Sequence, residues 1–183
     1  MRILLIGNSP IEAIPNIDFG KYCHIIRINN YKLGYGMGDK TTIWANGIAT
    51  VLDKDLSDIE VWGVFPLFTH KSGSKSLLNK ATIIPVEFIR MVYDEMFYDY
   101  KGFPHPSTGM LTLRYALELG HSVDLFNFSF FKDSVDGTNM YHHYWKADDE
   151  FDKSHKYVKK AHHGVREEMY VRNLMKRFDL KIL

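Results

Sequence analysis

Short apolar runs alternate along the chain with longer segments in which apolar residues recur every three or four positions. The first run, 2–7, leads into Gly-Asn-Ser-Pro, which predicts a buried strand stopped by a turn. Similar runs predict further strands at 23–28, 41–45, 60–65, 81–84, 122–128 and 180–183. Helical spacing predicts helices at 47–52, 74–79, 86–98, 107–119, 149–160 and 164–177, with the clearest amphipathic pattern at 107–119. Because strands alternate with helices, we expect a single α/β domain over 1–183, with a mainly parallel sheet and helices on both faces.

The composition narrows the class of protein. The chain has 183 residues, of which 45% are hydrophobic and 25% charged, so it can bury a proper core. No apolar run approaches the roughly 18 residues of a membrane span. Lys and Arg total 23 against 22 Asp and Glu, so no basic field indicates nucleic acid as a partner. The single cysteine, Cys23, and the absence of an apolar leader before the first strand predict a cytoplasmic protein.

Polar side chains follow several predicted strands. Ligands of a parallel sheet bind outside the carboxyl ends of its strands, so these side chains are candidates for binding a polar ligand. Each could instead be an ordinary turn residue, because Asn, Ser and Gly favour turns. Their recurrence at several strand ends favours a site. The candidates are Asn8, Ser9, Asn29, Asn46, Ser107, Thr108 and Gly109.

Ser107 opens the helix predicted at 107–119. A serine there caps the helix, and the free backbone N–H groups behind it also suit a phosphate or a carboxylate. Other segments are weaker candidates. The glycine-rich segment 34–42 lacks the Gly-Lys pair of a phosphate loop and precedes a strand. Acidic residues at 53–55 and 148–150 suit turns and helix starts better than a metal site.

Histidines are concentrated late in the chain, where five of the nine lie between His142 and His163. One interpretation is a zinc site, but no pair of histidines one helical turn apart accompanies a carboxylate or cysteine in a zinc pattern. The other interpretation is acid–base catalysis, in which one histidine removes a proton and another, protonated, faces an anionic leaving group. Glu167 would orient a nearby histidine and keep it basic.

Taken together, these segments resemble the motifs of the sialyltransferases, glycosyltransferase family 29. All four sialylmotifs have a counterpart, and they occur in the family's order. The large motif corresponds to 3–10, 17–18, 26–29 and 38–42, and the small motif corresponds to 106–128. The third motif corresponds to 142–145. The very small motif, His-x4-Glu, corresponds to His162 with Glu167.

The resemblance implies a Rossmann-like variant of the GT-A fold that binds a CMP-activated sugar and requires neither a metal nor another cofactor. It implies that Asn8 and Asn29 contact the phosphate and ribose of the donor, and that 107–109 holds the nucleotide and sugar. His143 matches the histidine that meets the leaving phosphate. His162 matches the general base that deprotonates the acceptor hydroxyl.

The very small motif can be aligned in two registers. His162 with Glu167 and His163 with Glu168 both satisfy His-x4-Glu. The first register is preferred, because the apolar residues that follow then fall where the family places them. It makes Glu167 the carboxylate that acts with the base.

The chain also departs from the family's pattern. The animal enzymes join two of these motifs by a disulfide, and neither partner position is a cysteine here; 120–122 stands where one is expected. His105 stands where animal members often have Tyr, and Asn127 where they have Gly. The missing disulfide agrees with a reducing cytoplasm and with a microbial or viral type of sialyltransferase.

The predicted function is transfer of sialic acid, or of Kdo, from a CMP-sugar to a glycan or glycolipid acceptor such as capsule or lipooligosaccharide. The resemblance implies that the transfer inverts the anomeric centre and needs no metal. Contact with the inner face of the membrane is expected if the acceptor is lipid-linked. Three alternatives stay open: a nucleotide-binding module without transferase activity, a sialyltransferase like those of family 42, and a metal-dependent hydrolase that uses the histidines.

Overall fold

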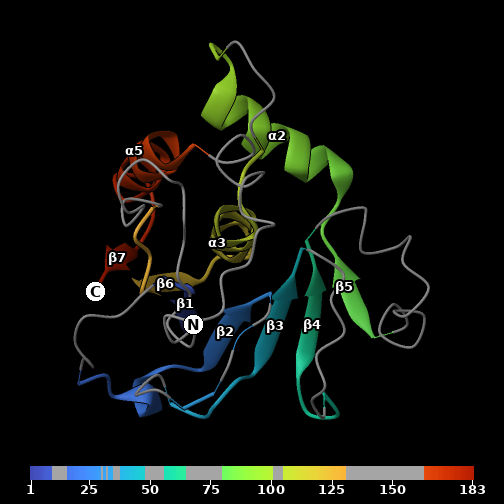
Figure 1. The fold of residues 1–183 in the computed structure, drawn as a ribbon, viewed down its shortest axis with the longest axis vertical. Coiled ribbons are helices and arrows are strands. Elements are labelled where there is room, and N and C mark those ends of the chain that lie inside the picture. Colours follow the sequence, from blue (N-terminus) through green and yellow to red (C-terminus); the bar gives the residue numbers. More distant parts are fainter. Residues whose placement is uncertain are drawn as a thin grey trace, which may run out of the picture.

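The computed structural model describes residues 1–9, 16–29, 31, 33–34, 38–47, 56–64, 80–100, 105–130 and 163–183. Its strands form one sheet in the order β5-β4-β3-β2-β1-β6-β7, and every pair is parallel (Figure 1). The strands are β1 (Arg2–Ile6), β2 (His24–Ile28), β3 (Ile43–Asn46), β4 (Glu60–Gly63), β5 (Ala81–Ile83), β6 (Ser122–Phe126) and β7 (Leu180–Ile182). The predicted α/β class and the parallel sheet are confirmed.

The described helices are the 3-10 helix η1 (Phe19–Lys21), α2 (Val86–Phe97), α3 (Thr108–Glu118) and α5 (Gly164–Leu174). The three α-helices match the segments predicted at 86–98, 107–119 and 164–177. The helices predicted at 74–79 and 149–160 lie outside the described residues, as does the one at 47–52 except for its first residue. The short helix η1 was not predicted.

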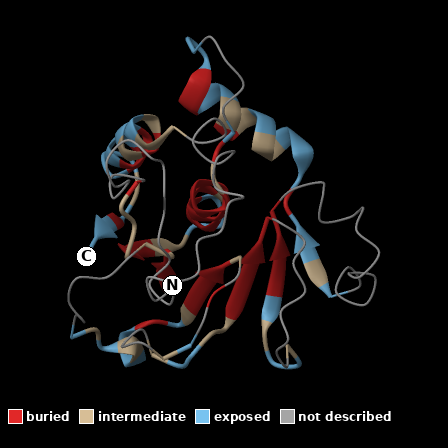
Figure 2. Ribbon diagram, in the orientation of Figure 1, coloured by how far each residue is buried: buried red, intermediate tan, exposed pale blue. Residues whose placement is uncertain are grey.

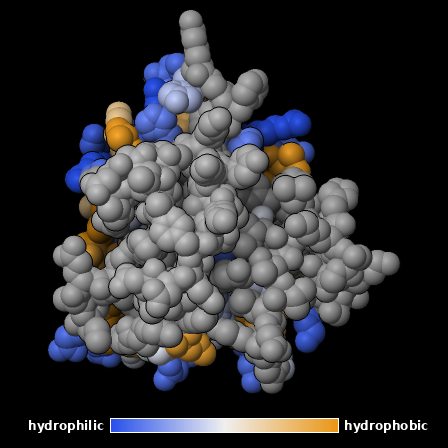
Figure 3. Space-filling view, in the orientation of Figure 1, coloured by the Kyte–Doolittle hydropathy of each residue, from blue (hydrophilic) through white to orange (hydrophobic). Residues whose placement is uncertain are grey.

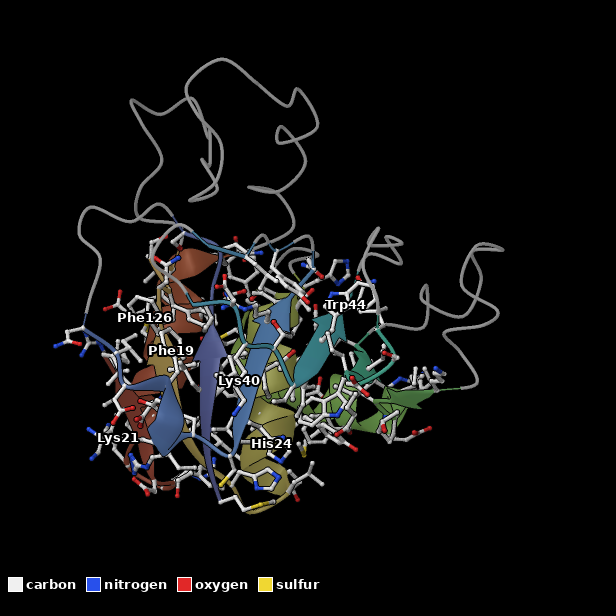
Figure 4. The ribbon with its side chains drawn as sticks, turned by 90° about the horizontal axis from the view of Figure 1, so that it is seen from below. Phe19, Lys21, His24, Lys40, Trp44 and Phe126 are labelled. Carbon is white, nitrogen blue, oxygen red and sulfur yellow. The ribbon has the colours of Figure 1, made fainter. Side chains whose placement is uncertain are left out.

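Alternate side chains of the strands enter different cores. Ile3 and Leu5 of β1 join the large core formed with α2, α3 and α5, whereas Leu4 and Ile6 pack on the other face against the chain around η1. Phe19 of η1 and Phe126 of β6 belong to this second core and lie near each other in Figure 4. In Figure 1 the three described α-helices lie on one side of the sheet and the η1 segment on the other. Sheet residues are therefore buried from both sides, as the near-continuous apolar runs of the sequence require.

The helix α3 is buried on almost every side, as the red colour of its ribbon in Figure 2 shows. Of its residues, Tyr115 is partly buried and Glu118 is exposed. Arg114 is buried as well, because its guanidinium pairs with Glu95 and Glu118 and lies over the rings of Phe88 and Phe178. Because arginine is usually exposed, the sequence alone would place Arg114 at the surface, whereas its ion pairs and ring contacts allow it to be buried.

The strand order reverses direction beside β1. From β1 the chain moves outward through β2, β3, β4 and β5, and then returns to the opposite side of β1 to form β6 and β7. Ile6 pairs with Phe126 at the carboxyl end of this central pair. Ligands of such sheets bind at the point of reversal, outside the carboxyl ends of the strands.

The surface of the described residues contains both hydrophilic and hydrophobic side chains. In the view of Figure 3, their hydrophilic and hydrophobic side chains are interspersed around the outline. Within the described ranges, no helix is long and apolar enough to cross a membrane.

Candidate active site

Ser107 begins the helix α3 at the carboxyl edge of the sheet. Its backbone is extended, and its Oγ accepts a hydrogen bond from the backbone N–H of Met110 at 3.3 Å, so it is the N-cap that its sequence position predicted. The α3 N-terminus therefore directs its positive dipole end toward the edge where ligands of parallel sheets bind.

The carboxylate of Glu167 is bound to this cap. The Ser107 backbone N–H donates to Oε1 and the Ser107 hydroxyl donates to Oε2, each at 2.9 Å. Glu167 is only 2% exposed, and burial raises its pKa to about 7, although the two hydrogen bonds from Ser107 act in the opposite direction. Glu167 of the very small motif is thus hydrogen-bonded to Ser107 of the small motif.

Asn29 is the central link between the strand ends and α3. Its side-chain Oδ1 accepts from the Gly47 backbone N–H at 2.9 Å, and its Nδ2 donates to Thr108 Oγ1 at 3.3 Å. Its backbone carbonyl accepts from the indole of Trp44 at 2.9 Å. With φ at 49°, Asn29 lies in the left-handed region, which asparagine tolerates better than most residues.

Asn8 and Ser9 follow β1 and contact both neighbouring strands. Asn8 Nδ2 donates to the Ile28 carbonyl at 3.0 Å, directly before Asn29. On the other side, the Ser9 hydroxyl donates to Ser129 Oγ and accepts from the Ser129 backbone N–H, both at 2.9 Å. The turn after β1 is therefore fastened to the ends of β2 and β6.

Asn127 and Phe128 complete this arrangement, and the sequence did not mark either as a site residue. Asn127 has φ at 60° and its Nδ2 donates to the carbonyls of Gly7 and Ser9 at 3.2 and 2.6 Å. A positive φ is one that asparagine tolerates better than most other residues apart from glycine. The Phe128 ring occupies the space beside Gly109, where a Cβ would approach its Cε1 to 2.7 Å. A Cβ at Gly7 would meet the Asn127 backbone first, with the carbonyl oxygen at 2.3 Å and Phe128 Cδ2 at 3.1 Å.

Comparison with known proteins agrees with this arrangement. The model of glycosyltransferase family 29 (sialyltransferase) matches residues 48–178, which is more than half of the chain. The chain belongs to glycosyltransferase family 29. As a sialyltransferase-family enzyme, it is a CMP-sugar-dependent glycosyltransferase.

Two crystal structures of a mammalian sialyltransferase share the fold of this family 29 enzyme. One, in complex with Gal-beta-1-3GalNAc-ortho-nitrophenol, has a TM-score of 0.69, and the other has a TM-score of 0.67. In both cases the sequences are 19% identical, and the match covers 100% of this chain and 68% of the other. No curated protein sequence matches the chain.

Most of the predicted site residues of this family 29 enzyme come together. Asn8, Asn29 and the segment 107–109 lie around one end of β1 and β2, and Glu167 is bonded to that segment. Asn46 is also at a strand end but is fully buried.

The two predicted catalytic histidines, His143 and His162, lie outside the described residues. Among the residues that are described, no three His, Cys, Asp or Glu side chains are grouped as a metal site would require. The described part of the site thus consists of amides, hydroxyls, backbone N–H groups and one buried carboxyl group.

Proposed function

We propose that this family 29 enzyme transfers sialic acid, or the related sugar acid Kdo, from its CMP derivative to a hydroxyl of a glycan acceptor. We further propose that the transfer inverts the anomeric carbon and needs no metal ion. The proposal is supported by two connected contacts. Asn29 is hydrogen-bonded to Thr108, and Ser107, which directly precedes Thr108, is hydrogen-bonded to Glu167. These residues match three of the four sialylmotifs, and the family's chemistry requires those motifs to meet around one donor molecule.

The donor carries two kinds of group that this edge of the sheet can bind. The first turn of α3 begins with backbone N–H groups and a positive dipole, which favour the phosphate or the sugar carboxylate. One of the two N–H groups of Asn29 Nδ2 donates a hydrogen bond to Thr108 Oγ1. The second hydrogen of this amide is the donor that we assign to the ribose or phosphate.

The reaction needs a base on one side of the anomeric carbon and a stabilised leaving group on the other. In the proposed step, the acceptor oxygen bonds to the anomeric carbon while the bond from that carbon to the phosphate oxygen breaks. CMP leaves with the bonding electrons, and His162 takes the hydroxyl proton. His143 and the α3 N-terminus stabilise the negative charge on the departing phosphate.

The proposal also includes a cytoplasmic location and a lipid-linked glycan as the acceptor. A cytoplasmic enzyme that acts at the inner face of a membrane would meet lipid-linked glycans such as precursors of capsule or lipooligosaccharide. The lone Cys23, which is exposed, is compatible with a reducing compartment.

The test is a nucleotide-binding scan followed by turnover. CMP should raise the melting temperature more than UMP or GMP at equal concentration, because a ligand that binds only the folded state stabilises it. CMP-Neu5Ac or CMP-Kdo should then be consumed in the presence of a glycan acceptor, at the same rate with and without EDTA. Preference for UMP or GMP contradicts the proposal. Binding of CMP without consumption of either donor indicates a nucleotide-binding module instead.

A further inference from the structure

Asn127 lies directly after β6, between the two segments that are proposed to hold the donor. Its Nδ2 donates to the carbonyls of Gly7 and Ser9, in the turn that follows β1. The next residue, Phe128, is so close to Gly109 that a Cβ there would lie 2.7 Å from its ring. Asn127 is therefore at the point where the strand order reverses, next to both the turn after β1 and the start of α3.

The two hydrogen bonds fix which way the amide of Asn127 faces. A side-chain amide presents two N–H donors on one side and an acceptor oxygen on the other. A carbonyl oxygen only accepts hydrogen bonds, so the nitrogen must face Gly7 and Ser9, at 3.2 and 2.6 Å. Both of its hydrogens are used there. The oxygen Oδ1 is therefore directed away from these two carbonyls, and the side chain can act on a ligand only as an acceptor.

The backbone of Asn127 is fixed as well. Its φ of 60° lies in the left-handed region. The carbonyls of Phe126 and Asn127 accept hydrogen bonds from the backbone N–H groups of Gly7 and Ser9, at 2.8 and 3.4 Å. A side chain held by its own backbone and by two bonds of its amide loses little conformational freedom when a ligand binds.

The Oδ1 atom of Asn127 is available to a ligand. Within the described ranges of the chain, no N–H or O–H group donates to this oxygen. The residue is only half-buried, so a ligand at the carboxyl end of β6 can reach it. A neutral acceptor suits an N–H or O–H group, whereas phosphate and carboxylate oxygens are acceptors themselves and gain nothing from it.

We infer that Asn127 Oδ1 accepts a hydrogen bond from the nucleoside part of the donor and thereby determines which nucleotide the enzyme prefers. This inference rests on the proposed function and adds a specificity-determining residue to it. Two kinds of nucleoside group carry a suitable hydrogen, the amino group of cytosine and the hydroxyls of ribose. The amide of Asn29 offers the donor an N–H group, and the amide of Asn127 offers it an acceptor.

The test is isothermal titration of the full chain with CMP, UMP, 2′-deoxy-CMP and 3′-deoxy-CMP. UMP has an oxygen in place of the cytosine amino group, and each deoxy analogue lacks one ribose hydroxyl. Asn127→Gly removes the amide and accepts the φ of 60° without strain. Asn127→Asp keeps an acceptor oxygen but loses the two N–H groups. The matched control is Asn173→Asp, which changes an exposed amide on α5 that accepts a hydrogen bond from Lys176.

The wild type and Asn173→Asp should bind the analogue that lacks the recognised group about tenfold more weakly than CMP, the effect of one hydrogen bond. In Asn127→Gly this preference should disappear for that one analogue, while the preferences over the other two stay within about twofold of the wild-type values. Asn127→Asp should keep the preference. Loss of the preference over UMP identifies the cytosine amino group, and loss of the preference over a deoxy analogue identifies that hydroxyl.

A purely structural role of Asn127 gives a different result. If the amide only holds the turn after β1, Asn127→Gly weakens all four nucleotides by the same factor and leaves every preference unchanged, which overturns the inference. The inference also fails if Asn127→Asp loses the preference as completely as Asn127→Gly. If the wild type binds none of the four nucleotides, the proposed function itself fails.

Discussion

Ser107 binds both oxygens of the Glu167 carboxylate, one through its backbone N–H and the other through its hydroxyl, each at 2.9 Å. The two residues are 60 positions apart, and they join the start of α3 to the first turn of α5. The segment proposed to hold the donor and the helix that follows the proposed base are therefore held at a fixed spacing by one buried side chain.

Glu167 should make the stability of the enzyme depend on pH around neutrality. Its pKa is raised from 4.5 to about 7, so between these values the folded state holds a proton that the unfolded state has lost. Stability should therefore fall as pH rises from about 4.5 to about 7 and change little above that. Relative to Glu167→Gln, which cannot titrate, we expect the wild type to lose about 2 to 3 kcal/mol between pH 5 and pH 8.

Urea denaturation at both pH values measures this difference, because the contributions of the other titrating groups cancel between wild type and variant. Glu168→Gln is the matched control, since it removes the neighbouring carboxylate that pairs with Arg172 at the surface. Its stability should follow the pH dependence of the wild type. Parallel curves for the wild type and Glu167→Gln would contradict the assignment.

Asn29 should contribute to donor binding through its amide and to stability through its backbone. Asn29→Gly removes the bonds to Gly47 and Thr108 but accepts the φ of 49° without strain. Asn29→Ala removes the same bonds and also adds about 1–2 kcal/mol of backbone strain. We expect the donor KM to rise about tenfold in both variants, the effect of losing a hydrogen bond worth about 1.4 kcal/mol.

Chemical denaturation should then rank Asn29→Gly above Asn29→Ala in stability. If the two variants are equally stable, backbone strain plays no part at this position. If both bind the donor as tightly as wild type, the amide of Asn29 does not touch it.

Gly109 should be intolerant of a side chain because of Phe128. A Cβ at Gly109 would lie 2.7 Å from Cε1 of that ring, so Gly109→Ala forces the ring to move. We expect Gly109→Ala to cost about 1–3 kcal/mol of stability, the usual range for overpacking a core. Adding Phe128→Leu should recover part of this loss, and a double-mutant cycle measured by urea denaturation gives the coupling. Additive effects of the two substitutions would show that the ring is not the obstacle.

His162 and His163 should have different kinetic signatures. His162→Ala should reduce kcat by about a hundredfold to ten-thousandfold, the usual contribution of a general base, and should leave CMP binding close to that of the wild type. His163→Ala removes a ring that packs against Tyr100, so we expect a much smaller change in kcat than for His162→Ala. Steady-state kinetics with CMP binding as a control decide between them. The reverse result would assign the base to His163 and the motif to its second register.

The fold was largely predictable because its signals are local. Apolar runs such as 2–7 and 122–128 end in polar turns, and the structure has strands there within two residues of the predicted ends. The positions of Asn8 and Asn29 after their strands were also predictable, since a parallel sheet brings the carboxyl ends of its strands together.

The partners within the site were not predictable, because they depend on tertiary packing. The contact between Glu167 and Ser107, which are 60 positions apart, depends on how α5 packs against the start of α3 and has no local signal in the sequence. Similarly, nothing in the sequence relates Gly109 to the Phe128 ring, or Gly7 to the Asn127 carbonyl, although both pairs are in close contact in the structure. A glycine directly after the first strand and another at the start of α3 were the signals that neighbouring atoms leave no room for a side chain.

The pairing of β1 with β6 also sets an order of events during synthesis. Gly7 and Asn127 are bonded although they are 120 positions apart, so β1, which is synthesised before the other described strands of this sheet, has its second neighbour only after β6 is made. Until then β1 has one unpaired edge, and an unpaired apolar edge is a site of aggregation. A chain that stops before β6 should therefore precipitate or be degraded, because β6 and the residues after it complete both the sheet beside β1 and the candidate site.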